Sequence, residues 1–180
     1  MEHYESVLTF WFSDIEPQMW WQRSADFDAL IARHFSDLLA RAAQGECAAW
    51  RENARGRLAE IIVLDQFSRH IYRDTPQAYA QDALALQCAQ EAVRIGADRL
   101  LPVPKRAFMY MPYMHSEDRR VHDLAIKLFN VPGMEHSLSF ERQHKSIIDR
   151  FGRDPHRNAV LGRENAFEEI KFLQQAHTHF

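Results

Sequence analysis

The feature that most constrains the fold is the spacing of apolar residues, which recur three or four positions apart along most of the chain. The stretch 24–44 shows this spacing at Phe27, Leu30, Ile31, Phe35, Leu38, Leu39 and Ala42. Steps of three and four residues place side chains on one face of an α-helix. Ser24 fits the N-cap of this helix, and Gly45 fits the left-handed position that follows its end. The alternation typical of β-strands is nearly absent.

The same spacing predicts helices along the remainder of the chain. Residues 56–73 are apolar on several sides, which predicts a central helix. Thr75, Ser116 and Asn165 are expected to be the N-caps of later helices, with Glu168 as capping-box partner of Asn165. We expect Pro112 to disturb a short helix within 105–120, and the other helices to cover 75–96, 116–129 and 139–151, with one helical turn over 155–162. The chain is therefore predicted to be all-α, with about seven to nine helices packed as antiparallel hairpins in a single domain over residues 1–180.

Composition excludes several classes of protein. Among 180 residues, 46% are hydrophobic and 26% are charged, which is typical of a soluble globular domain. The net charge of −3 argues against a nucleic-acid partner or an anionic membrane. Cys47 and Cys88 have no paired spacing, so neither a disulfide framework nor a cysteine-based zinc site is expected. The first fourteen residues have no basic leader and no long apolar run, which predicts a cytoplasmic protein. No motif for a cofactor is present.

Polar residues interrupt the apolar pattern at three places. On a straight helix, Asp65 and Arg69 share a face with Leu58, Ile61 and Ile62. A buried carboxylate and a buried guanidinium must be paired and hydrogen-bonded. Without a partner, the loss of hydration costs on the order of several kcal/mol for each ion. The pair is either a structural ion pair or a guanidinium held at a cavity.

The other two places lie further along the chain. His115 and Glu117 flank Ser116, and His115 could reach either the core or a cleft. His122 is four residues from Asp118 and is predicted to form a surface pair with it. His144 shares a helix face with apolar residues and points inward, as either a core histidine or a ligand-binding group. The methionines at 109, 111 and 114 fill the core or line an apolar pocket.

The segment 150–164, RFGRDPHRNAVLGRE, contains four arginines and one aspartate between its first arginine and Arg163. Guanidinium groups suit carboxylate or phosphate groups, which they bind with two parallel hydrogen bonds. The same arginines could instead cap the preceding helix and pair with Asp65, Glu117 or Glu168. Structural pairing of this kind accounts well for the presence of one or two arginines in the segment. It accounts less well for the presence of four.

Four motifs in order, VLTFWF, LAEIIVLDQFSRHIYR, HSED and FGRDPHRNAVLGR, resemble the bacterial domain-of-unknown-function family 924 over nearly the whole chain. The resemblance implies an all-α fold with a tetratricopeptide-like superhelical arrangement and no established activity. It places eight polar residues on the motifs of the family: Asp65, Arg69, His115, Glu117, Arg153, His156, Arg157 and Asn158. His70, His122 and Asp154 depart from the pattern, which weakens any role assigned to them.

Three hypotheses remain open from the sequence. In the first, the polar residues converge on a cleft between helices that binds a small anionic ligand bearing phosphate or carboxylate. His115, Glu117 and His156 would then be the catalytic residues of a hydrolytic or proton-transfer reaction. The residues expected to bind the ligand are Asp65, Arg69, His144, Arg153, Arg157 and Asn158.

The other two hypotheses assign different roles to the same residues. The second is a non-enzymatic, helical-repeat-like module that binds a protein or peptide partner, with polar clusters that are structural. The third is a metal site built from His115, Glu117, His144 and His156. It ranks last because the spacing of these residues is irregular, and no metal site is predicted.

Overall fold

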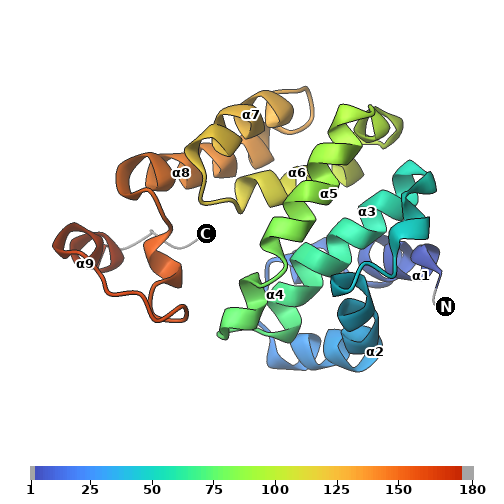
Figure 1. Cartoon of the computed structure of the whole chain (residues 1–180), viewed down its shortest axis with the longest axis horizontal. Helices are drawn as coiled ribbons and strands as arrows, with labels where there is room; N and C mark the ends of the chain where they lie inside the picture. The colour runs from blue at the N-terminus through green and yellow to red at the C-terminus, as the bar shows by residue number, and fades with distance from the viewer. Residues whose placement is uncertain (1–2, 176–180) are drawn as a thin grey trace.

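The computed structural model describes residues 3–175, and all regular structure within that range is helical (Figure 1). The predicted all-α class is confirmed. The α-helices are α1 (Tyr4–Thr9), α2 (Ala25–Ala43), α3 (Ala54–Ile62), α4 (Ser68–Ile71), α5 (Asp82–Arg94), α6 (Val103–Met114), α7 (Arg119–Phe129), α8 (Glu135–Phe151) and α9 (Phe167–Leu173). Two π-helical segments cover Phe10–Asp14 and Val63–Phe67, and short 3₁₀ helices cover Pro17–Trp20, Ala48–Glu52, Pro76–Tyr79, Ala97–Leu100 and Pro155–Arg157.

A continuous helix formed by α3, the π segment Val63–Phe67 and α4 lies at the centre of the fold. Helices α1, α2, α5 and α6 all pack against it, so its residues 56–68 are buried on every side. This explains why residues 56–73 lack a polar face, and the predicted central helix is confirmed. The π segment has a wider turn than an α-helix, so the side chains beyond it are rotated from the positions that a straight helix would give them.

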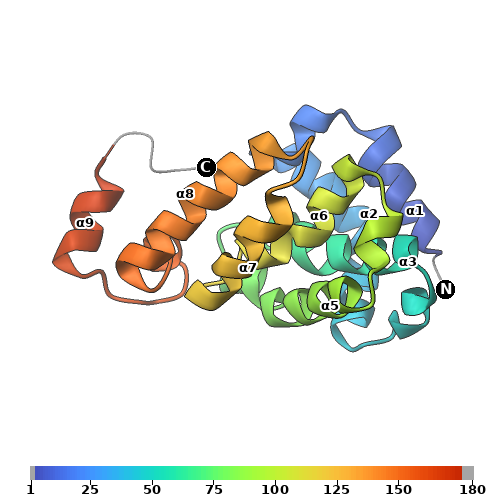
Figure 2. The same cartoon turned by 90° about the horizontal axis from the view of Figure 1, so that it is seen from above.

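Later helices pack against their neighbours in the chain. Helix α5 contacts α6, α6 contacts α7, and α7 contacts α8. Figures 1 and 2 both show α7 and α8 side by side, with α1 and α9 near opposite ends of the long axis. This arrangement is consistent with a tetratricopeptide-like superhelix, which stays a prediction. The single domain over residues 1–180 also stays a prediction, and residues 1–2 and 176–180 lie outside the described part of the chain.

Two helix ends agree with the sequence. Ser24 Oγ accepts a hydrogen bond from the backbone N–H of Phe27, which confirms Ser24 as the N-cap of α2. Gly45 follows that helix with φ of 81°, the left-handed conformation in which glycine has little steric cost. Helix α6 passes through Pro112 and ends at Met114, so the proline falls in the last turn of this helix.

Three predicted N-caps are wrong because another residue begins each helix. Thr75 precedes a 3₁₀ helix, and α5 begins only at Asp82. Ser116 accepts a hydrogen bond from the backbone of Asp118, which itself caps α7. Near the C-terminus, Glu169 accepts from the backbone N–H of Ala166 at 2.7 Å. The predicted partners Asn165 and Glu168 are therefore each one residue early.

Two further features bear on the functional class. None of the helices in residues 3–175 is long and apolar enough to cross a membrane. Cys47 and Cys88 are both buried thiols. Burial raises the pKa of each to about 11, which leaves the thiols protonated and weakly nucleophilic near neutral pH. Both cysteines belong to the hydrophobic core.

Candidate functional site

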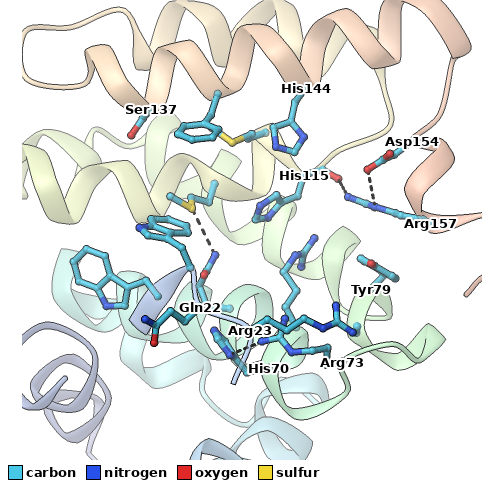
Figure 3. A pocket seen from close by; sticks show the side chains of 18 of the residues that line it. Gln22, Arg23, His70, Arg73, Tyr79, His115, Ser137, His144, Asp154 and Arg157 are labelled. Carbon is cyan, nitrogen blue, oxygen red and sulfur yellow. Dashed lines mark hydrogen bonds and ion pairs between the residues drawn. The ribbon is translucent and has the colours of Figure 1, made fainter. Parts of the chain in front are cut away.

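A cavity of about 530 Å³ opens where the central helix faces α6 and α8 (Figure 3). This volume is in the range of small-molecule sites. Charged and imidazole side chains from five parts of the chain line it: Arg23, Arg69, His70, Arg73, Asp74, His115, His136, His144, Asp154 and Arg157. In Figure 3, His70 and Arg73 face His115 and His144 across the cavity, and Tyr79 and Arg157 lie at one end.

A buried carboxylate holds the ring of His115 at the cavity. Nδ1 of His115 lies 2.7 Å from Oδ1 of Asp65, whose side chain is 1% exposed. Burial acts to raise the pKa of Asp65, but His115 and Arg69 outweigh it and hold that pKa below its ordinary value. Asp65 is thus an anion that orients the ring of His115. Within residues 3–175, Nε2 of His115 makes no hydrogen bond, so this nitrogen is available to a molecule bound in the cavity.

A shared carboxylate joins two guanidinium groups beside this pair. Arg69 contacts both oxygens of Asp82, at 2.7 and 3.0 Å, and also lies 3.0 Å from Asp65. Nη1 of Arg157 lies 3.3 Å from the same Asp82, and its Nη2 donates to the backbone carbonyl of His115 at 2.7 Å. Both guanidinium groups lie over the ring of Tyr79. The predicted ion pair between Asp65 and Arg69 is confirmed as part of this larger network.

A second carboxylate fixes the opposite wall. Asp28 accepts two hydrogen bonds from Arg73, at 2.5 and 2.8 Å, and lies 2.7 Å from Nδ1 of His70. Arg23 forms an ion pair with Asp74 at the rim, where both side chains are more than half exposed. The ion pair between Arg23 and Asp74 is therefore more accessible to solvent than the pair between Arg73 and Asp28. Asp74 has φ of 61°, a left-handed conformation that is uncommon for residues other than glycine.

His144 is a weakly basic imidazole in the cavity lining. Burial, and then the nearby His115, lower its pKa to about 3. The two rings lie 6.3 Å apart. At neutral pH the side chain of His144 is therefore uncharged. The ring next to His115 in the cavity is thus a neutral imidazole.

The low pKa of His144 predicts a pH dependence of stability. Between pH 6.5 and pH 3 the unfolded chain binds a proton at this site that the folded protein excludes, so stability falls as the pH falls. Replacing His144 with glutamine removes this term. We expect the free energy of unfolding of His144→Gln, measured with urea, to fall less steeply than that of the wild-type protein below pH 6.5. The difference in slope is at most about 1.4 kcal/mol per pH unit. Parallel curves for the two proteins would contradict the assignment.

Five of the residues chosen from the sequence surround the cavity. Arg69, His115, His144 and Arg157 line it, and Asp65 supports it from behind. Their predicted roles in binding or catalysis stay predictions. Four others do not reach its lining: Glu117, Arg153, His156 and Asn158.

Glu117 belongs to an adjoining polar junction. Its carboxylate accepts two hydrogen bonds from Arg163, each 2.9 Å long, and one from the backbone N–H of Asp154 at 2.7 Å. Burial acts to raise the pKa of Glu117, but Arg163 and the Asp154 backbone lower it overall. Glu117 lines a second hollow of about 460 Å³, which shares the side chains of Tyr79, His115 and Arg157 with the cavity. Its contacts are those of a structural anion.

The remaining three residues fasten the C-terminal segment. Arg153 binds both oxygens of Glu169, at 2.7 and 2.8 Å, and lowers the pKa of that carboxyl to about 2. Asn158 is fully buried and donates to Glu169 at 3.2 Å. Nδ1 of His156 lies 2.8 Å from Asp154, and its ring contacts Phe172. Arg150 lies 3.5 Å from Glu168. The structural interpretation of segment 150–164 therefore holds for Arg150, Arg153 and Arg163, whereas Arg157 reaches the cavity.

His122 is not the surface residue that the sequence predicts. It is 0% exposed, with Nδ1 2.7 Å from Glu141 and Nε2 2.7 Å from the carbonyl oxygen of Ser116. Asp118, the predicted partner, pairs with Arg120 instead. The pair formed by His122 and Glu141 fastens α7 and α8 to the loop that carries His115.

Several cavity residues escaped the sequence analysis. His70 and Arg73 follow the Asp-Gln-Phe motif. The projection of this segment on a straight helix does not indicate which part of the fold their side chains face. Asp82, which stands behind the lining and pairs with Arg69 and Arg157, was missed because the helix was predicted to begin at Thr75, which made Asp82 an interior position. Arg23 lies in a loop with no local signal. Among the residues described, no three His, Cys, Asp or Glu side chains are placed to hold a metal ion, so the four-residue metal hypothesis has no assembled site.

Comparisons with known proteins agree with this architecture. The family model described as "Bacterial protein of unknown function (DUF924)" matches residues 7–177. The solved structure of a protein of unknown function from Agrobacterium tumefaciens is 36% identical in sequence, with a TM-score of 0.90, and the match covers 95% of this chain and 96% of that one. No curated protein matches the chain.

Proposed function

The chain belongs to the bacterial family of proteins of unknown function DUF924, and within that family we propose that its cavity binds a small ligand bearing a phosphate or carboxylate group. The charges of the lining carry this proposal. Four guanidinium groups but only two carboxylates are among the described lining residues. The carboxylates of Asp28, Asp65 and Asp82 stand behind this lining, where they hold the cations in place. Planar guanidinium groups held in this way suit a tetrahedral or planar anion.

The second element of the proposal is proton exchange by His115. A histidine whose Nδ1 is fixed by a buried carboxylate presents Nε2 in a defined direction, as acid–base catalysts do. Asp65 supplies that carboxylate, and the adjacent His144 is neutral. The proposed reactions are hydrolysis or proton transfer on the bound anion, with the arginines stabilising negative charge and His115 giving or accepting the proton.

Calorimetric titration with inorganic phosphate tests the binding. Wild-type protein is expected to bind phosphate at one site, and Arg73→Gln to bind it about tenfold more weakly, since one charge-assisted contact contributes about 1.5 kcal/mol or more. Arg73 is chosen because its side chain is 27% exposed, so the variant is expected to fold. Arg99→Gln is the matched control, because Arg99 is exposed and outside the cavity lining.

Two outcomes would count against the proposal. Equal phosphate affinity of Arg73→Gln and wild-type protein would place the anion elsewhere. Absence of binding, combined with a stoichiometric protein partner in a pull-down experiment, would favour the non-enzymatic binding module. In that case the cavity network would be a structural feature of the helical scaffold.

A further inference from the structure

The cavity has an apolar component that the anion site does not use. Besides Tyr79, whose ring faces Arg69 and Arg157, five of its lining side chains are aromatic or sulfur-containing: Trp20, Trp21, Met111, Met114 and Phe140. Trp21 is 62% exposed, which is unusual for the largest apolar side chain. Met111 and Met114 are buried at the end of α6, on the same helix that leads into His115. A site for inorganic phosphate alone would have no use for this surface.

The apolar and cationic parts lie along one direction. Ser137, Phe140 and His144 are successive lining residues of α8, and the last of them stands beside His115. Figure 3 shows Ser137 at one end of the cavity and Arg157 and Tyr79 at the other, with His144 between them. At 1.5 Å per residue, the part of α8 from Ser137 to His144 spans roughly 10 Å. The cavity is therefore long enough for a ring in addition to an acidic group.

The apolar part is lined by aromatic rings whose orientations are fixed by neighbouring rings. Trp21 is stacked on Phe108 at an interplanar angle of 8°, and Trp20 meets Phe108 edge-on with ring centroids 4.8 Å apart. Phe140 is held edge-on by His136, with 4.8 Å between centroids. Aromatic rings add specific edge and face contacts to the burial of apolar area, and methionine sulfur packs favourably against ring edges.

We propose that the ligand is an aromatic organic anion, with its phosphate or carboxylate toward Arg69, Arg73 and Arg157 and its ring against Trp21, Phe140 and the two methionines. This inference rests on the proposed anion site and adds the chemical class of its ligand. His115 lies between the two parts, because it contacts Asp65 on the cationic side and follows Met114 in the chain. The bond that joins the ring to the acidic group would then lie near its imidazole.

Phenyl phosphate, cyclohexyl phosphate and inorganic phosphate are the probes. By calorimetric titration, phenyl phosphate is expected to bind the wild-type protein at least about tenfold more tightly than inorganic phosphate. Cyclohexyl phosphate has a ring of similar size that is not flat. It is expected to bind at least about threefold more weakly than phenyl phosphate. Phe140→Ala and Trp21→Ala should each reduce the preference for phenyl phosphate and leave the affinity for inorganic phosphate unchanged.

Phe167→Ala is the matched control, because Phe167 is 69% exposed on α9 and outside the cavity lining. Equal binding of phenyl and inorganic phosphate would overturn the aromatic inference and leave the anion site intact. Equal binding of phenyl and cyclohexyl phosphate would also overturn it, since the ring would then act only as an apolar body. Failure of all three probes to bind would overturn the anion site itself.

Discussion

Replacement of Asp65 by alanine is expected to lower the free energy of unfolding by about 3 kcal/mol. The substitution leaves the guanidinium of Arg69 and the ring of His115 without the buried carboxylate that faces them at 3.0 and 2.7 Å. Removing one member of a buried ion pair costs more than the pair contributes, because the other member stays desolvated. Arg69 keeps Asp82 as a partner, which holds the loss near the lower end of the known range. Urea denaturation measures it.

Asp123→Ala is the control for this experiment. Asp123 also pairs with a cation, Lys145, but its side chain is 63% exposed. An exposed pair contributes between about 0 and 1 kcal/mol, so this variant should remain close to wild type. If Asp65→Ala were no less stable than Asp123→Ala, Asp65 would not be the buried anion that organises the cavity.

Replacement of Asp82 by asparagine is expected to lower stability and raise anion affinity at the same time. Asp82 links the guanidinium groups of Arg69 and Arg157, so its loss costs about 2 kcal/mol of stability. The same change removes a negative charge that contacts the guanidinium groups proposed to bind the phosphate. For a separation of about 7 Å and an effective dielectric constant of about 20, the repulsion removed is about 2 kcal/mol, so phosphate should bind at least about tenfold more tightly.

Asp74→Asn separates the two effects of Asp82→Asn. Asp74 pairs with Arg23 at the rim, where side-chain exposures of 62% and 69% make the pair nearly neutral for stability. The variant should therefore gain some phosphate affinity without the loss of stability. Thermal denaturation and calorimetry on both variants provide the comparison. Lower stability of Asp82→Asn together with weaker phosphate binding would mean that Asp82 shapes the site and does not compete with its ligand.

The fold could be predicted from the sequence where local physics decides the outcome. The apolar spacing from Phe27 to Ala42 and the cap at Ser24 are properties of a single helix, and both appear in the structure. The N-caps at Ser116 and Asn165 failed because several neighbouring polar residues can accept hydrogen bonds from the backbone N–H groups of a helix start. Asp118 accepts from the N–H of Arg120, and Glu169 accepts from the N–H of Ala166. Such competition is decided by tertiary contacts.

The site was predictable only in part, for two physical reasons. The π segment Val63–Phe67 changes the rotation of the residues beyond it, so the directions of His70 and Arg73 could not be read from a straight helix. Pairings between distant residues, such as Arg73 with Asp28, have no local signal either. His122 has a plausible surface partner four residues away, yet it is buried against Glu141 on the next helix.

Diffraction from crystals grown with tungstate, a heavy analogue of phosphate, tests the anion site most directly. The tungsten atom gives an anomalous signal that locates the anion without reference to activity. The account predicts a peak inside the cavity, in contact with the guanidinium groups of Arg69, Arg73 or Arg157 beside His115. Peaks confined to the outer surface, with none in the cavity at a tungstate concentration that occupies those surface sites, would contradict it.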